Sequence, residues 1–184
     1  MTENEIMQEA LAQGFSAAAV VDTGKIVFDP AFRPYCAENL CGQYGANYSC
    51  PPTCGSPAEM RAKVLAYRRA LFLQSEWQVP DLSDQKQWHT CKDAHNAAMH
   101  TLLAKLRGAG LVGFMIGASA CTLCRPCRMG RGEACPYPQK RFSCLSAYCI
   151  YVKHLAEECH IRYDYQNGIL PFFGMYVFDP IDRL

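Results

Sequence analysis

The twelve cysteines of this 184-residue chain constrain its fold and function more than any other feature. Most of them fall in two short windows, residues 36–54 and 121–149, whereas cysteines that act only as small buried hydrophobes are scattered through a core. The first thirteen residues carry glutamates and no lysine or arginine, which is the wrong sign for a secretory signal. We therefore expect a cytoplasmic protein. In that reducing compartment, grouped cysteines favour metal binding or catalysis over disulfide bonds.

The rest of the composition is that of an ordinary globular protein. Half of the residues are hydrophobic and 19% are charged, so a core can form without covalent or metal cross-links. A net charge of +1 argues against a nucleic-acid or membrane-surface partner, and no apolar stretch is long enough to span a bilayer. No linker or low-complexity tract divides the chain, so we predict a single metal-binding domain over residues 1–184.

Helix and strand signals alternate along the chain. Thr2 and Glu5 form a capping box that predicts an N-terminal helix, and residues 56–69 and 85–107 carry the signals of two longer helices. A turn signal at residues 22–24 predicts a hairpin. The remaining predicted elements are strands at residues 15–21, 25–28, 70–75, 111–116, 161–165 and 175–178, and a short helix at residues 148–158. The pattern predicts an α/β or α+β fold, with a mixed sheet, flanking helices and two cysteine-rich metal loops.

The strongest metal-binding signal is a run of three cysteines spaced two residues apart. The run is Cys121-Thr-Leu-Cys124-Arg-Pro-Cys127, and Cys135 follows it with a proline directly after. Two intervening residues let a tight turn present successive thiolates to one face of a cluster, as in ferredoxin loops. Zinc sites more often use two separated pairs of ligands. The spacing therefore favours a [4Fe-4S] cluster on these four cysteines, with zinc as the alternative.

Basic side chains are interleaved with these ligands, and Glu133 is the only acidic side chain among them. Positive charge lowers the pKa of a thiol and stabilises a reduced, more negative cluster. A plain solvated loop would explain the basic residues but not their place among the cysteines. They are Arg125, Arg128, Arg131, Lys140 and Arg141.

The second window contains Cys36, Cys41, Cys50 and Cys54. Their spacings of four, eight and three residues are less diagnostic than those of the first group, so a second cluster and a zinc ion both stay open. A loop this long, with no helical or strand periodicity, needs an interaction that orders it. This favours bound metal over side-chain packing alone.

The other cysteines give weaker signals. Cys91 and His95 lie one helical turn apart, but no further ligand pair accompanies them. Cys144 and Cys149 are candidate alternative ligands for the cluster of the 121–135 group. Cys159 is expected to be buried and inert.

The two windows together resemble the DUF2284 family of predicted metal-binding proteins. The resemblance rests on the loop Cys-x4-Cys-x2-Tyr-Gly-x4-Cys-Pro-Pro at residues 36–52 and the loop Gly-x3-Cys-x2-Cys-x2-Cys from residue 117, and it covers about residues 15–180. It implies a cytoplasmic protein with a [4Fe-4S] cluster and implies no particular reaction. The motif positions match Cys36, Cys41, Cys50, Cys121, Cys124, Cys127 and Cys135. Cys54 is extra, and the Cys144-Leu-Ser-Ala segment departs from the usual Met-Glu-Ala.

Three functions are compatible with these patterns. The leading one is electron transfer, or the redox-cluster part of a reductase, with a redox protein as partner. The second is an enzyme whose [4Fe-4S] cluster keeps one iron open as a Lewis acid, and the third is a zinc-stabilised interaction module. Cys135 decides between the first two, because a carrier needs four thiolates and an open site needs three. No catalytic residue is singled out.

Overall fold

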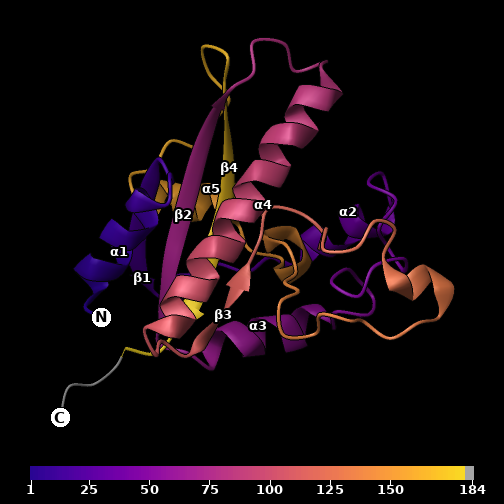
Figure 1. Ribbon diagram of the computed structural model, residues 1–184, viewed down its shortest axis with the longest axis horizontal. Coiled ribbons are helices and arrows are strands. Elements are labelled where there is room, and N and C mark those ends of the chain that lie inside the picture. Colours follow the sequence, from indigo (N-terminus) through magenta and orange to yellow (C-terminus); the bar gives the residue numbers. More distant parts are fainter. Residues whose placement is uncertain (181–184) are drawn as a thin grey trace.

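The computed structural model describes residues 1–180, in which four strands form one sheet (Figure 1). The strands are β1 (Ala17–Asp22), β2 (Arg69–Gln78), β3 (Gly113–Ile116) and β4 (Ile169–Phe178). Their order is β1-β2-β4-β3, and every neighbouring pair is antiparallel. The predicted combination of helices with one sheet is confirmed, but the sheet is antiparallel throughout and not the mixed sheet that the sequence predicted. The strands β2 and β3 do run parallel, but β4 inserts between them and pairs antiparallel with both.

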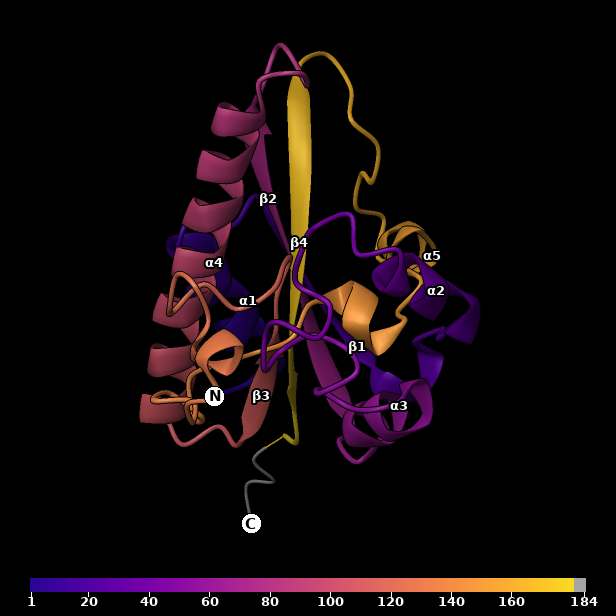
Figure 2. The ribbon, with the colours of Figure 1, turned by 90° about the vertical axis from the view of Figure 1, so that its right-hand side faces the viewer.

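Helices cover both faces of this sheet, which Figure 2 shows nearly edge-on. One face carries α1 (Glu3–Ala12) and α4 (Gln85–Gly108). The other face carries α2 (Arg33–Ala37), α3 (Pro57–Leu65) and α5 (Val152–Glu158). Short 3-10 turns complete the chain: η1 (Thr23–Lys25), η2 (Pro30–Phe32), η3 (Arg128–Arg131) and η4 (Leu145–Tyr148). No helix of residues 1–180 is long and apolar enough to cross a membrane.

The two layers of helices create two cores, one on each face of the sheet. Leu71 and Leu73 of β2 pack with the helices α1 and α4, while Ala70 and Phe72 pack with α3, η4 and α5. All four side chains are fully buried. A strand that is covered on both faces reads as a continuous apolar run, which is why residues 70–75 could be predicted as a buried strand.

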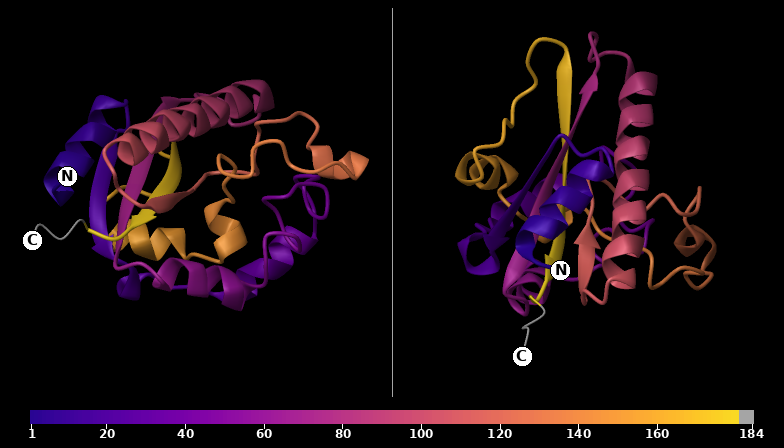
Figure 3. Two further views of the ribbon diagram at one scale, coloured as in Figure 1. Left: turned by 60° about the horizontal axis from the view of Figure 1, so that its bottom comes forward. Right: turned by 60° about the vertical axis from the view of Figure 1, so that its left-hand side comes forward.

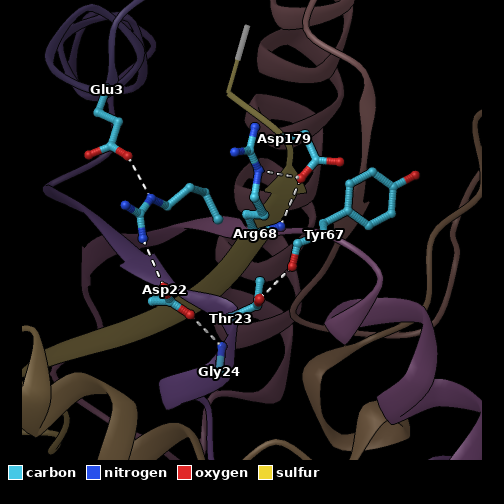
Figure 4. Close-up of polar contacts among 8 residues, drawn as sticks. Glu3, Asp22, Thr23, Gly24, Tyr67, Arg68 and Asp179 are labelled. Atoms are coloured by element: carbon cyan, nitrogen blue, oxygen red, sulfur yellow. Dashed lines mark hydrogen bonds and ion pairs between the residues drawn. The ribbon is translucent and has the colours of Figure 1, made fainter. Parts of the chain in front are cut away.

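The predicted hairpin at residues 22–24 is wrong, because hydrogen bonds of Asp22 and Thr23, one of them to the distant Tyr67, turn the chain away from β1 (Figure 4). The Asp22 carboxylate accepts a hydrogen bond from the Gly24 N–H at 2.8 Å, and the buried Thr23 hydroxyl donates to the Tyr67 carbonyl. The chain therefore enters η1, and residues 25–28 form no strand beside β1. Instead, Phe28 forms an isolated antiparallel bridge with Ile150.

The predicted strand at residues 161–165 is also absent, and β4 is longer than expected because it starts at Ile169. The segment before β4 contacts β2 through side chains. Arg162 forms an ion pair with Glu76 at 2.5 Å, and its carbonyl accepts a hydrogen bond from the Gln74 side chain. These contacts bind the segment to the sheet without strand pairing.

Gly113 provides a test of the β3–β4 pairing. A Cβ atom at this position would lie 2.1 Å from the Val177 carbonyl oxygen, which is backbone and cannot move aside cheaply. Gly113→Ala is therefore expected to lower the free energy of unfolding by about 1–3 kcal/mol, the usual cost of overpacking. Gly108→Ala is the control, because that Cβ would meet no atom within 4 Å on a helix and should cost nothing. Urea unfolding of both variants measures the difference, and equal stabilities would contradict the observed pairing.

The two cysteine windows meet at one end of the molecule, where the loop after β3 lies beside the loop after α2 (Figure 3). The first of these loops leaves the sheet at Gly117 and returns at Cys144, where the two residues form a parallel bridge. The Gly117 N–H donates to the Ser143 carbonyl at 2.8 Å, and the Leu145 N–H donates to the Gly117 carbonyl at 3.0 Å. The bridge holds the two ends of the loop together and fixes them to the sheet. We call this closed base of the loop, at Gly117 and Cys144, its neck.

Candidate metal centre

The four predicted ligands of the first group line one small cavity. Cys121, Cys124, Cys127 and Cys135 all contribute to its wall. Its volume is about 10 Å³, roughly the space of a single water molecule. The loop thus brings Cys135 back to the run of three, although seven residues separate it from Cys127.

The Cys121 thiol is influenced both by burial and by the other cysteines of the group. Burial raises the pKa of its thiol, the N–H of Leu123 lowers it, and the nearby thiolates of Cys135, Cys127 and Cys124 raise it. Several thiols in electrostatic contact cannot all lose their protons unless a cation compensates. A bound metal would supply that charge, because coordination deprotonates a thiol outright.

Two of the five basic residues of the loop reach the cavity, and a third turns away from it. Arg128 and Arg141 line the cavity. Hydrogen bonding to Glu133, and to a smaller extent the neighbouring Cys124, raises the pKa of Arg128. Arg125 instead forms an ion pair with Asp93 of α4 at 2.5 Å. The positive charge beside the thiols therefore comes from Arg141 and from Arg128, which also forms an ion pair with Glu133.

Asn47 and Ser49 connect the two cysteine loops, and the sequence did not reveal either of them. The buried Asn47 amide donates to the Cys121 carbonyl at 3.0 Å, and the Ser49 hydroxyl accepts from the Cys121 N–H at 2.8 Å. The Asn47 side-chain oxygen in turn accepts from the Ser49 hydroxyl at 2.9 Å. Their position in the fixed spacer before Cys50 is the only signal that could have indicated them.

Tyr48 lies at the cavity between these two residues. Its hydroxyl donates to the Glu133 carbonyl at 2.8 Å, and the Arg141 guanidinium lies 5.2 Å from the centre of its ring. Arg141 also donates to the Tyr48 carbonyl at 3.3 Å. The second loop thus provides part of the wall around the first cysteine group.

The second group extends from α2 into the loop that leads to α3. Cys36 lies in α2, Cys41 is exposed, and Cys50 is buried. Burial raises the pKa of Cys50 to about 12, and the nearby thiolates of Cys144, Cys41 and Cys54 also raise it, against a hydrogen bond from Ser49. Cys50 is thus the most enclosed cysteine of this group.

Cys144 and Cys149 lie beside this second group. The Cys149 carbonyl accepts from the Asp29 N–H at 2.8 Å, which ties the turn η4 to the segment that enters α2. Burial raises the pKa of Cys144 to about 11, and the Cys36 thiolate raises it further. The structure therefore does not bring these two cysteines to the first group, for which the sequence offered them as alternative ligands.

Cys91 and His95 are both buried and pack against other residues of the protein interior. Cys91 packs in a small apolar cluster with Val79 and Phe172. The fully buried His95 ring has its Nδ1 atom 2.6 Å from the Ser75 hydroxyl. Cys159 is half-buried against the core on the α5 side of the sheet.

The chemistry of the first group fits a metal cofactor. Thiolate sulfur is the donor that iron–sulfur clusters and zinc use, and cationic side chains and a backbone N–H lie next to the thiols. Within residues 1–180, no three His, Cys, Asp or Glu side chains already converge as ligands of a single metal ion. A cubane is larger than the present cavity, whose outer residues Arg128, Pro136 and Tyr137 are exposed.

Comparison with known proteins gives one match. The family model described as "Predicted metal-binding protein (DUF2284)" matches residues 19–178, which include both cysteine loops. No curated protein and no solved structure matches the chain.

Proposed function

We propose that this chain, which belongs to the DUF2284 family of predicted metal-binding proteins, holds a [4Fe-4S] cluster on Cys121, Cys124, Cys127 and Cys135. The single observation that carries the proposal is that these four side chains line one cavity. The cluster supplies one-electron chemistry when it is bound. The role proposed for the protein is electron transfer in a reducing, cytoplasmic compartment, together with a redox partner protein.

The spacing of the ligands and the surroundings of the cavity support a cluster over zinc. Three cysteines in succession at two-residue spacing suit a cluster, whereas structural zinc sites use separated pairs. Arg128 and Arg141 would offset the negative charge of a reduced cluster, and the Leu123 N–H lies against the Cys121 sulfur. Hydrogen bonds and positive charge at the sulfurs raise the reduction potential of such a centre.

The position of Cys135 supports an electron carrier over an enzyme with an open iron. Because Cys135 lines the same cavity as the other three, a fourth thiolate is in reach. Complete ligation keeps substrates away from iron. The cavity also lies near the surface, since Pro136 and Tyr137 at its edge are exposed, and an exposed edge lets electrons pass to a docked partner.

Anaerobic purification tests the proposal directly. The protein is expected to be brown, to contain at least about four iron and four sulfide per chain, and to lose its broad visible absorption on addition of dithionite. Iron, sulfide and zinc analysis with low-temperature electron paramagnetic resonance provides the measurement. Stoichiometric zinc without sulfide in anaerobically reconstituted protein would reject the cluster, and binding of added cyanide to iron in the unmodified protein would reject the carrier.

A further inference from the structure

The residues that follow η4 make backbone contacts, which the sequence does not indicate, with the segment that leads to α2 and the second cysteine loop. The Tyr151 N–H donates to the Val27 carbonyl at 2.9 Å, and Phe28 bridges Ile150. These contacts join the end of η4 to the chain just before α2, and η4 contacts both α2 and α3. Cys144, at the start of η4, is therefore held on the side of the second group.

Arg33 joins the same two segments and lies among their cysteines. Its guanidinium donates to the Gly55 carbonyl at 2.9 Å and to the Ala147 carbonyl at 2.7 Å. Its Nε atom is buried and has no hydrogen-bond partner in the described part of the chain. The charge of Arg33 lowers the pKa values of Cys36 and Cys54, against the raising effect of burial. A buried cationic donor without a full set of acceptors fits a site that holds anionic sulfur.

The four cysteines of this region lie on segments that contact one another. The Cys54 N–H donates to the Cys50 carbonyl at 3.0 Å, so these two residues share one turn. The helix α2, which holds Cys36, contacts the turn η4, which begins directly after Cys144. Cys54 and Cys144 also pack against the same hydrophobic core.

We infer that Cys144 completes a second thiolate metal site with Cys36, Cys50 and Cys54, and that Arg33 is its charge partner. The site draws its ligands from both cysteine windows, because Cys144 lies at the end of the loop that carries the first group. Each ligand would release its proton to solvent as it binds the metal. Cys41 belongs to the same loop but is exposed, and it remains outside the ligand set. This inference does not rest on the proposed function, because the site requires no cluster on the first group.

The decisive experiment uses the full-length Cys121→Ser/Cys124→Ser protein, so that the first site contributes nothing. Anaerobic titration with Co²⁺ in the presence of a phosphine reductant is expected to give thiolate-to-cobalt charge-transfer absorption that saturates near one equivalent. Adding Cys144→Ser should weaken Co²⁺ binding by at least about tenfold, since even second-shell changes cost that much. Adding Cys41→Ser, the matched control from the same loop, should leave the affinity within about twofold.

The inference would be overturned by absence of Co²⁺ binding by the parent protein, and also by equal binding after Cys144→Ser. Loss of binding with Cys41→Ser alone would assign the fourth ligand to Cys41 and overturn it as well. Should Cys144→Ser fail to fold, alkylation of the parent protein decides the question. Cd²⁺ is expected to slow the reaction of iodoacetamide at Cys144 while Cys41 reacts unchanged, and identical rates at Cys144 with and without Cd²⁺ would exclude it as a ligand.

Discussion

Replacing Cys121 and Cys124 together by serine is expected to remove all of the metal that the first site holds. Serine oxygen is a hard donor and a poor substitute for thiolate on iron or zinc. Two remaining thiolates would not retain a cluster that normally has four. Anaerobically prepared protein should therefore lose about four iron and four sulfide per chain, together with the matching visible absorption.

The same substitutions should leave the fold intact, because none of the four cysteines of the first group belongs to a hydrophobic core in residues 1–180. Circular dichroism and urea unfolding of metal-free protein should match the wild type. Cys159→Ala is the control, since it removes a cysteine outside both groups and should keep the full iron content. An unchanged iron count in the double variant would place the metal elsewhere and reject the assigned ligands.

The second large effect is a loss of stability in acid that comes from His95. Burial lowers its pKa from 6.5 to about 4. Above pH 6.5 the ring is neutral in both the folded and the unfolded chain, so the group causes no change with pH there. Between pH 6.5 and 4 the unfolded chain binds a proton that the folded chain does not. The free energy of unfolding should therefore fall by about 3 kcal/mol across this window.

The variant His95→Asn isolates this effect, because asparagine has no titrating ring and its amide can take the place of Nδ1 beside Ser75. It should be less stable than the wild type at pH 7, and the difference should shrink by about 3 kcal/mol by pH 4. Urea unfolding of metal-free protein across this range provides the measurement. The exposed His160 provides the control, since His160→Asn should leave the pH dependence unchanged. Parallel pH curves for the wild type and His95→Asn would contradict the prediction.

Features that depend on local sequence could be predicted well. The capping box of Thr2 and Glu5 starts α1 as expected, and α4 covers the predicted residues to within one position. The buried strand β2 follows from its apolar run because both of its faces are covered. In these elements the chemistry that sets the structure lies within a few residues.

Features that depend on distant parts of the chain could not be predicted. The antiparallel sheet results from the insertion of β4, which no local pattern encodes. The hairpin signal at residues 22–24 was overridden by the hydrogen bond from Thr23 to Tyr67, across more than forty positions. The position of Cys144 follows from the bridge between Phe28 and Ile150, whose residues are even farther apart in sequence. For the same reason Asn47 and Ser49 could not be recognised as the contacts of Cys121.

The order of the strands also bears on when the protein can fold during synthesis. The inner strand β4 is the last strand of residues 1–180, and it comes after all twelve cysteines. Until a ribosome has released residues 169–178, β2 and β3 have no common neighbour, and the neck at Gly117 and Cys144 has no sheet to anchor it. Such long-range pairing is slow to form. The nascent chain thus exposes its thiols before the sheet that positions them has formed. Both cysteine groups reach their folded positions only after residues 169–178 have been synthesised.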